Sequence, residues 1–221
     1  MSPESAKDFY NRQYGLHKDG RISCPNSLHD LEKAHRRVRG VFHAFRIPTP
    51  LHGASVLDVG CGLGYYTKAL SCTGANVLGI DISQAGTECA RSSFPECQFR
   101  CAAWPDNIEK EPKFDIIWTV GLSLINTLDV HMIHEKLIVE AQPRLKPGGS
   151  LILGWGTNFS GRTQGNWSHW SLEMLHRMRA QCGLSVPIVP VVRARWLSWL
   201  VIRTGSVIRK EVPIFMRRVS H

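Results

Sequence analysis

Short apolar runs that alternate with helical segments constrain the fold of this chain more than any other feature. Five such runs are bounded by turn residues: 55–60, 76–82, 98–103, 114–121 and 150–156. Helical patterns fill the intervals between them, at 63–72, 84–92 and 129–145. Strands that are apolar on both faces and joined through helices predict a parallel sheet covered by helices on both sides.

Further elements are expected on both flanks of this alternation. Residues 27–46 predict an amphipathic helix that ends before Pro48 and Pro50. Two last strands, about 184–190 and 210–219, would pair antiparallel with each other. We therefore expect a doubly wound, Rossmann-like α/β fold with a seven-stranded mixed sheet and helices on both faces.

A helix is also expected over residues 168–182, with Ser168 or Ser171 as its N-cap and Gly183 as its stop. The chain has 221 residues, of which 43% are hydrophobic, enough for one sizeable domain. We expect residues 1–50 to form an N-terminal helical cap or lid and residues 51–221 to form the main domain.

Composition and cysteine usage narrow the class of protein. No stretch approaches the roughly 18 uninterrupted apolar residues of a membrane span, and the first residues lack the apolar core of a secretory signal. The seven cysteines form no C-x-x-C pair, and His131 and His134 lack a third ligand at metal spacing, so no metal site is expected. A cytoplasmic location is expected.

The net charge of +9 is concentrated at the two ends of the chain. Residues 160–221 carry ten Lys and Arg against two acids, whereas residues 51–159 are slightly acidic. Basic ends suit a phosphate-bearing substrate, a nucleic acid or a membrane surface. The basic residues at the two ends could equally serve only to keep the protein soluble.

A glycine-rich loop between the first strand and its helix carries the chemistry. In VLDVGCGLG (56–64) the chain turns on Gly60, Gly62 and Gly64, and Asp81 follows 21 residues after Gly60 at the end of the second strand. An acid at that spacing can accept hydrogen bonds from the ribose hydroxyls of a nucleoside cofactor. The spacing G-x-G-x-G departs from the dinucleotide fingerprint G-x-G-x-x-G, so a pyrophosphate-binding turn is disfavoured.

Four ordered segments resemble the motifs of class I S-adenosylmethionine-dependent methyltransferases. VLDVGCGLG is similar to the family's first motif and GIDIS (79–83) to its second-strand motif. FDIIWTVG (114–121) and LKPGGSLIL (145–153) are similar to its fourth- and fifth-strand motifs. The resemblance implies that S-adenosyl-L-methionine is the cofactor and that methyl transfer is the activity.

The resemblance also implies residue roles. The three loop glycines would wrap the methionine portion, Asp58 would orient the loop and the amino group, Asp81 would bind the ribose, and Ile82 would lie against the adenine. Asp58 could instead brace the loop without touching the ligand. The expected cofactor contacts are completed by Cys61, Ala103, Trp104 and Gly121.

One position departs from the family's pattern. After the third strand the family usually has an acid that accepts from the adenine amino group, and here Ala103 and Trp104 stand in that place. Adenine would then be held by the backbone of these two residues and by the indole ring.

The acceptor is expected to be a small molecule. The chain lacks the Pro-Pro-aromatic motif of base N-methylation after the fourth strand and the Pro-Cys dipeptide of cytosine carbon methylation. We therefore expect an O-methyltransferase with an apolar, anionic, or lipid- or sugar-linked acceptor. The candidate general base is His169, and Asp129 is a weaker candidate that reads more simply as an N-cap. Alternatives are an RNA methyltransferase that uses the basic ends, and a non-catalytic partner subunit.

A basic, tryptophan-rich segment at 191–209 stands between the last two expected strands. Trp196 and Trp199 are flanked in sequence by Arg193 and Arg195. The segment is compatible with a helix packed on the sheet, a lid over a hydrophobic acceptor, or a helix at a membrane surface. As a lid, it would place both indoles against the acceptor.

Overall fold

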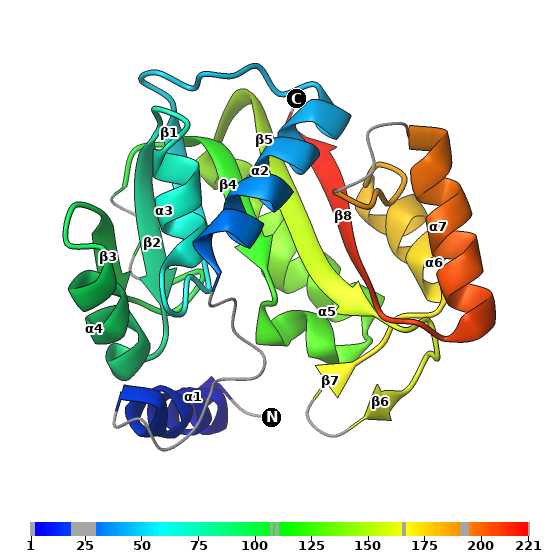
Figure 1. The fold of residues 1–221 in the computed structure, drawn as a ribbon, viewed down its shortest axis with the longest axis horizontal. Coiled ribbons are helices and arrows are strands. Elements are labelled where there is room, and N and C mark those ends of the chain that lie inside the picture. Colours follow the sequence, from blue (N-terminus) through cyan, green and yellow to red (C-terminus); the bar gives the residue numbers. More distant parts are fainter. Residues whose placement is uncertain are drawn as a thin grey trace.

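A six-stranded sheet forms the centre of the molecule in a computed structural model that describes residues 3–18, 30–106, 108, 111–164, 167–190 and 195–220 (Figure 1). The strand order is β3-β2-β1-β4-β5-β8. β1 to β5 run parallel, and β8 pairs antiparallel with β5. The strands are β1 (Ser55–Val59), β2 (Asn76–Asp81), β3 (Gln98–Cys101), β4 (Phe114–Val120), β5 (Leu145–Thr157) and β8 (Val212–Val219).

Helices cover both faces of this sheet, as the sequence predicts. α2 (Leu31–Phe45) and α3 (Tyr65–Ser71) lie on one face; α5 (Val130–Ile133), the π-helical turn η2 (His134–Val139) and α6 (Leu172–Cys182) lie on the other (Figure 1). α4 (Gln84–Ser93) packs against β2 and β3. The predicted doubly wound, Rossmann-like fold is confirmed.

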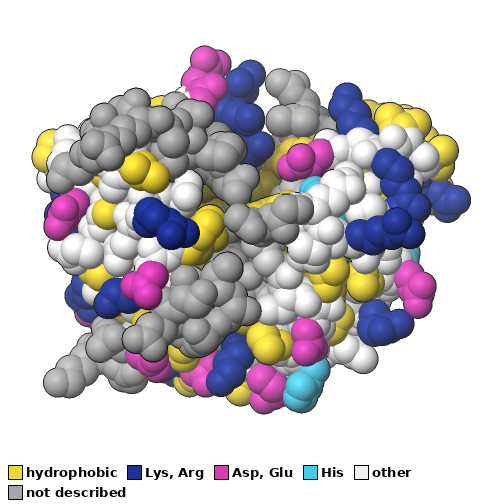
Figure 2. All heavy atoms as spheres, turned by 90° about the horizontal axis from the view of Figure 1, so that it is seen from below, with side chains coloured by type: hydrophobic (Ala, Val, Ile, Leu, Met, Phe, Trp, Pro, Cys, Tyr) yellow, Lys and Arg dark blue, Asp and Glu magenta, His cyan; other side chains and the backbone are white. Residues whose placement is uncertain are grey.

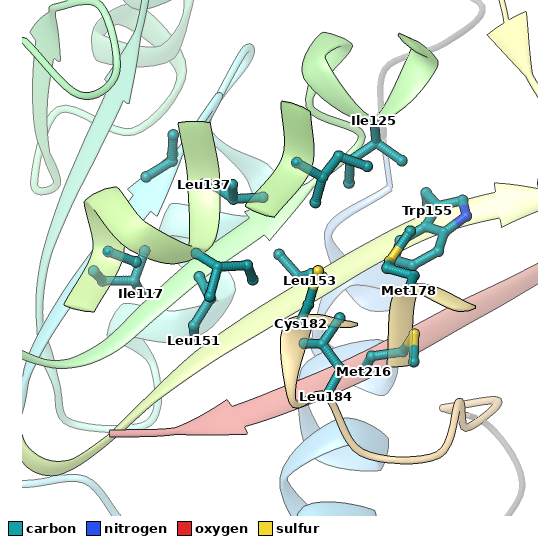
Figure 3. Packing of buried hydrophobic residues seen from close by; sticks show 14 of the residues in the cluster. Ile117, Ile125, Leu137, Leu151, Leu153, Trp155, Met178, Cys182, Leu184 and Met216 are labelled. Carbon is teal, nitrogen blue, oxygen red and sulfur yellow. The ribbon is translucent and has the colours of Figure 1, made fainter. Parts of the chain in front are cut away.

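Successive residues of each central strand enter opposite cores. Leu57, Ile117 and Leu153 belong to the cluster under α5, η2 and α6, shown in Figure 3. Their strand neighbours Val56 and Trp118 belong to the cluster under α2 and α3. Because both faces of these strands are buried, the strands read as continuous apolar runs.

The helices begin and end at residues that can cap them. The side chain of Asp30 caps α2 by accepting from Lys33 N at 2.9 Å, and Arg46 ends the helix with φ of 54°. Ser171 caps α6 and Gly183 ends it with φ of 61°. Ser171 is therefore the cap of this helix, while Ser168 pairs in the short hairpin of β6 (Thr163–Gln164) and β7 (Trp167–Ser168).

The seventh strand that the sequence predicts at 184–190 does not form. The segment runs beside β8, but it forms one β-bridge, between Ile188 and Phe215, and one further backbone hydrogen bond, from Ser185 N to the Arg217 carbonyl oxygen. Pro190, two residues after Ile188, lacks the N–H that would continue the ladder, which explains why the bridge stays isolated. The described part of the central sheet therefore has six strands.

The predicted helix at 129–145 is shorter than expected. It consists of α5 and η2, and the short 3-10 turn η3 (Gln142–Arg144) leads directly into β5. β5 begins at Leu145, earlier than the predicted 150–156. Another 3-10 turn, η1 (Ser123–Thr127), follows β4.

The two remaining helices lie at the periphery. α1 (Pro3–Lys18) packs on α4 below the carboxyl ends of the strands, and α7 (Arg195–Ile208) lies beside the edge strand β8 (Figure 1). α2, which falls within the predicted N-terminal cap, shares the buried cluster of the sheet. A role as a lid for the N-terminal region stays a prediction.

A substitution at Gly40 can test how closely α2 packs on the chain that follows α6. A Cβ at this position would lie 1.5 Å from the Pro190 carbonyl oxygen. Gly→Ala inside a helix ordinarily stabilises by about 0.5–1 kcal/mol. Here the clash reverses the sign, and we expect Gly40→Ala to lower the free energy of unfolding by about 1–3 kcal/mol.

Gly15 in α1 provides the matched control for this measurement in urea. A Cβ there would have no neighbour within 4 Å, so Gly15→Ala should show the ordinary helical gain or no loss. Equal effects of the two substitutions would contradict the close packing of α2 on Pro190.

Candidate active site

The glycine loop lies between β1 and α3 at the carboxyl ends of the parallel strands. The N–H groups of Gly60 and Cys61 both donate to the Ile80 carbonyl oxygen, at 2.8 and 2.9 Å. These bonds tie the loop to the end of β2. Gly62 and Gly64 have φ of 50° and 84°, which side chains other than glycine rarely adopt.

Asp81, the last residue of β2, holds this loop directly. One carboxylate oxygen accepts from Gly62 N at 2.9 Å and the other accepts from Ser83 N at 2.8 Å. The side chain is 7% exposed. Burial raises the pKa of this carboxyl above its ordinary value, while the two N–H donors act in the opposite direction.

Asp58 lies in β1 immediately before the loop. Its carboxylate accepts a hydrogen bond from Thr67 Oγ1 of α3 at 2.7 Å, and the residue is 2% exposed. Burial raises its pKa to about 7, against the opposing effect of the Thr67 hydroxyl. A cation placed near this buried carboxyl would therefore favour its ionised form.

The Cys61 side chain faces away from the open side of the loop. It packs in a small cluster with Ala90 of α4 and Phe99 of β3. Burial raises the pKa of its thiol well above the ordinary value. The contribution of Cys61 to the site therefore comes from its backbone.

The expected adenine-side residues follow the neighbouring strands β2 and β3. Ile82 is half-buried, and Ala102 N, just before Ala103, donates to the Asp81 carbonyl oxygen at 2.9 Å. The indole N–H of Trp104 donates to the Lys136 carbonyl oxygen at 2.8 Å, which fixes this loop against η2. The structure therefore brings Ile82 and Ala103 to the same edge as Asp81.

Sequence reasoning did not single out α1 as a source of site residues. The Tyr14 hydroxyl lies 2.6 Å from the place where a Cβ on Gly62 would be, so this ring covers the glycine loop. Asn11 accepts from Ser83 Oγ at 2.8 Å and from Ala85 N at 3.3 Å, which anchors α1 to the start of α4. Asp81 and burial both raise the pKa of Tyr10, burial more strongly. The four-residue spacing of Tyr10 and Tyr14, which places both rings on one face of a helix, was the sequence signal that could have pointed to them.

The ends of β4 and β5 form the other half of this edge. Gly121 has φ of 71°, and a Cβ there would lie 3.8 Å from the Trp167 ring. Trp167 donates from its indole N–H to the Gly156 carbonyl oxygen at 3.2 Å. Figure 2 views this face of the molecule and shows hydrophobic side chains inside its hollowed middle.

His169, the predicted general base, is 6% exposed and already engaged. Asn158 N donates to its Nδ1 at 3.1 Å, so the neutral ring carries its proton on Nε2. Asp129 caps α5 by accepting from His131 N and Met132 N, so the simpler of its two predicted roles, that of an N-cap, is the one the structure shows. The base role of His169 stays a prediction.

Part of the chain is similar to known methyltransferase domains. Residues 56–149 match the family described as "Methyltransferase domain". Solved structures agree in fold: a magnesium protoporphyrin IX methyltransferase from Synechocystis PCC 6803 with bound SAH has a TM-score of 0.62 at 15% identity, covering 100% of both chains. A TehB-like SAM-dependent methyltransferase from Corynebacterium glutamicum has a TM-score of 0.53 at 18% identity, covering 99% of both chains.

Curated relatives match this chain over the same region. A ubiquinone biosynthesis O-methyltransferase from Idiomarina loihiensis is 33% identical over 108 residues, which cover 46% of this chain and 42% of the relative. One from Xylella fastidiosa is 36% identical over 110 residues, covering 47% and 42%. The matches thus span less than half the length of these relatives.

The burial of Asp58 predicts a cost to stability in the absence of ligand. Its folded-state pKa of about 7 lies above the ordinary value of 3.8, so the folded state holds a proton that the unfolded state releases as the pH rises. Stability contributed by the protonated form is therefore lost between about pH 4 and about pH 7. Asp58→Asn should raise the free energy of unfolding at about pH 8 by roughly 2–4 kcal/mol.

Chemical denaturation at several pH values measures this effect. The gain from Asp58→Asn should shrink as the pH falls toward about 5, because the wild-type carboxyl is then protonated in the fold. Glu96→Gln, an exposed carboxylate paired with Lys68, serves as the control and should show no such gain. A destabilised Asp58→Asn protein at about pH 8 would contradict the assignment.

Proposed function

We propose that this chain transfers a methyl group from S-adenosyl-L-methionine to an oxygen atom of a small molecule. The observation that carries the proposal is the glycine loop bonded to the buried carboxylate of Asp81 at the carboxyl edge of a methyltransferase fold. The similarity to curated O-methyltransferases supports the choice of oxygen.

The cofactor would lie across the ends of β1 and β2. Asp81 would accept from the ribose hydroxyls, and the backbone around Gly62, under Tyr14 of α1, would receive the methionine portion. Ile82 and the backbone at Ala103 would border the adenine. The sulfonium supplies the electrophilic methyl group when the cofactor is bound.

Asp58 would complement the positive amino group of the cofactor. A buried carboxyl with a pKa of about 7 is ionised only in part at neutral pH, and a cation close by favours its charged form. The Thr67 hydroxyl keeps this carboxylate oriented at 2.7 Å. Cofactor binding would then release a proton whenever the pH lies below about 7.

The acceptor would enter between α1 and the loops that follow β4 and β5. Tyr14 covers the glycine loop from one side, and Trp167 lies over Gly121 on the other. These aromatic surfaces suit an apolar ring or chain in the acceptor. α1 would act as the lid predicted from the sequence, because its Asn11 anchor can separate from Ser83 without disturbing the sheet.

The proton of an acceptor hydroxyl requires a base. His169 could take it only after its ring releases the Asn158 amide, because Nδ1 is the acceptor of that bond. With that bond intact, His169 orients the loop after β5. Loss of turnover in His169→Ala with unchanged cofactor affinity and an unchanged pH profile would favour this positioning role.

RNA methylation and a non-catalytic subunit remain the competing functions. Calorimetry with S-adenosyl-L-methionine and its demethylated product separates the enzyme from the subunit, since a subunit need not bind either. A salt-dependent affinity for RNA would favour the nucleic acid acceptor. A screen of phenolic and catecholic acceptors with labelled methyl donor tests the proposed reaction itself, and no labelled product from any of them would count against it.

Replacing Asp81 tests the cofactor site. Asp81→Ala removes the charge-assisted acceptor, at about 1.5–3 kcal/mol for each lost bond, so cofactor affinity should fall by at least tenfold in calorimetry. Glu96→Ala, which removes an exposed carboxylate paired with Lys68 beyond the end of α4, should leave the affinity unchanged. A folded Asp81→Ala protein with wild-type affinity would show that the assignment is wrong.

The pH dependence of binding tests Asp58. Because the cofactor cation favours the carboxylate, affinity should fall by about eightfold between about pH 7.5 and about pH 6, as protons compete for a group with a pKa of about 7. In Asp58→Asn this decrease should disappear, with weaker binding throughout. A decrease of the same size in the variant would place its origin elsewhere.

A further inference from the structure

α7 exposes large apolar side chains on its outer side. Trp196 is 68% exposed, Trp199 is 59% exposed and Val207 is 83% exposed, with Leu200 and Ile208 also exposed. Scattered exposed apolar residues are ordinary on protein surfaces, whereas a contiguous set marks an interaction surface.

The exposed residues form one stripe along the helix. Trp196, Leu200, Arg203 and Val207 are three or four residues apart, so they lie on one face at 3.6 residues per turn, with Trp199 beside them. The guanidinium of Arg203 lies 4.9 Å from the centroid of the Trp199 ring. We call this stripe the outer face of α7.

The opposite face of α7 is the one that packs on the protein. Ser198 Oγ accepts from Val189 N at 3.3 Å, and Ile202 is buried. A Cβ on Gly205 would lie 2.8 Å from Val212 of β8. The helix therefore packs one face on the protein and still leaves its largest apolar residues outside, whereas a surface helix that faces water carries polar residues there.

The charge of α7 is entirely positive. Residues 195–208 contain Arg195 and Arg203 and no acid, and Arg209 and Lys210 follow directly. The side of Figure 2 on which α6 and α7 lie shows Lys and Arg side chains next to hydrophobic ones. Arg193 precedes the helix in sequence and lies outside the described residues.

We propose that the outer face of α7 docks on an anionic membrane surface. Trp residues at headgroup depth, aliphatic residues below them and Lys or Arg around them are the composition of a helix that lies in a lipid interface. Among the described residues, no helix is long and apolar enough to cross a membrane. α7 would lie on the surface, attracted by acidic headgroups at about 1 kcal/mol per cation.

A second copy of this chain fits the outer face less well. In a two-fold symmetric contact the same surface meets itself, so the Arg203 side chains of two copies would approach each other. With no acid on α7, nothing in the helix would compensate this repulsion. An anionic lipid surface satisfies both the indoles and the cations.

The position of α7 connects this surface to the proposed reaction. Arg209 donates from its guanidinium to the Phe159 carbonyl oxygen at 2.7 Å, in the loop that follows β5. The last turn of α7 thus lies at the carboxyl edge of the sheet, where the acceptor would enter. A membrane in contact with α7 would border that entrance, but the docking itself does not depend on the proposed function.

Flotation of the full chain with vesicles tests the proposal. Vesicles of phosphatidylcholine mixed with phosphatidylglycerol should carry the protein, and vesicles of phosphatidylcholine alone should carry much less. Trp196→Ser combined with Trp199→Ser should lower the partition coefficient by at least tenfold. Arg203→Gln should lower it about fivefold on the anionic vesicles only, since one charge contributes about 1 kcal/mol.

Matched variants separate docking from general surface effects. Met132→Ser combined with Val139→Ser removes two exposed apolar residues from α5 and η2, and Arg36→Gln removes one exposed cation from α2. All of these proteins should keep the wild-type thermal unfolding midpoint and cofactor affinity, and the controls should keep vesicle binding. These readouts distinguish a failure of docking from a failure of the proposed function.

Three results would overturn the proposal. The first is the absence of flotation with the anionic vesicles, and the second is flotation that the paired tryptophan variant leaves unchanged. The third is a stable dimer in sedimentation velocity that the paired tryptophan variant dissociates, because the outer face would then be an interface between copies of the chain.

Discussion

The hydrogen bond from Gly62 N to the Asp81 carboxylate is the interaction on which the rest of the site depends. It joins the turn after β1 to the end of β2, two elements that are neighbours in the sheet but 19 residues apart in sequence. The same carboxylate also receives Ser83 N at the start of α4, so one buried acid sets the positions of a loop and a helix. Asp81 therefore organises the site even before it meets a ligand.

Much of this arrangement could be predicted from the sequence, because it follows local patterns. The apolar runs located the five parallel strands along the chain, since the central strands are buried on both faces. Gly183 marked the end of α6, and its start was narrowed to Ser168 or Ser171, because φ above zero and a side-chain acceptor are requirements of single residues. The loop glycines and Asp81 were found for the same reason.

What could not be predicted depends on contacts between distant parts of the chain. The contact of Tyr14 with the glycine loop requires α1 to return over α4, which no local pattern specifies. The strand expected at 184–190 did not form, because Pro190 lacks the N–H that would extend the pairing beyond Ile188. The engagement of His169 Nδ1 by Asn158 N became visible only once the loop after β5 was placed.

Aromatic residues have opposite roles in the core and on α7. On the α2 side, Trp118 lies in contact distance of Phe42 and Phe215, with ring centroids 6.1 and 5.6 Å apart, and is fully buried. On α7 the indoles face outward beside a guanidinium. The first arrangement stabilises the fold, whereas the second leaves apolar surface that the chain itself does not cover.

Each glycine around the site is constrained by a different neighbour. A side chain on Gly62 would meet Tyr14 of α1, one on Gly64 would meet Phe99 of β3, and one on Gly79 would meet Thr67 of α3. In evolutionary terms, a lineage that lost or replaced α1 would relieve the steric limit that Tyr14 sets at Gly62 and Gly86, while Gly64 and Gly79 would stay fixed by the sheet and its helices. Gly62 would still be constrained by its φ of 50°, so divergence of the N-terminal helix would free α4 at Gly86 more than it would free the loop.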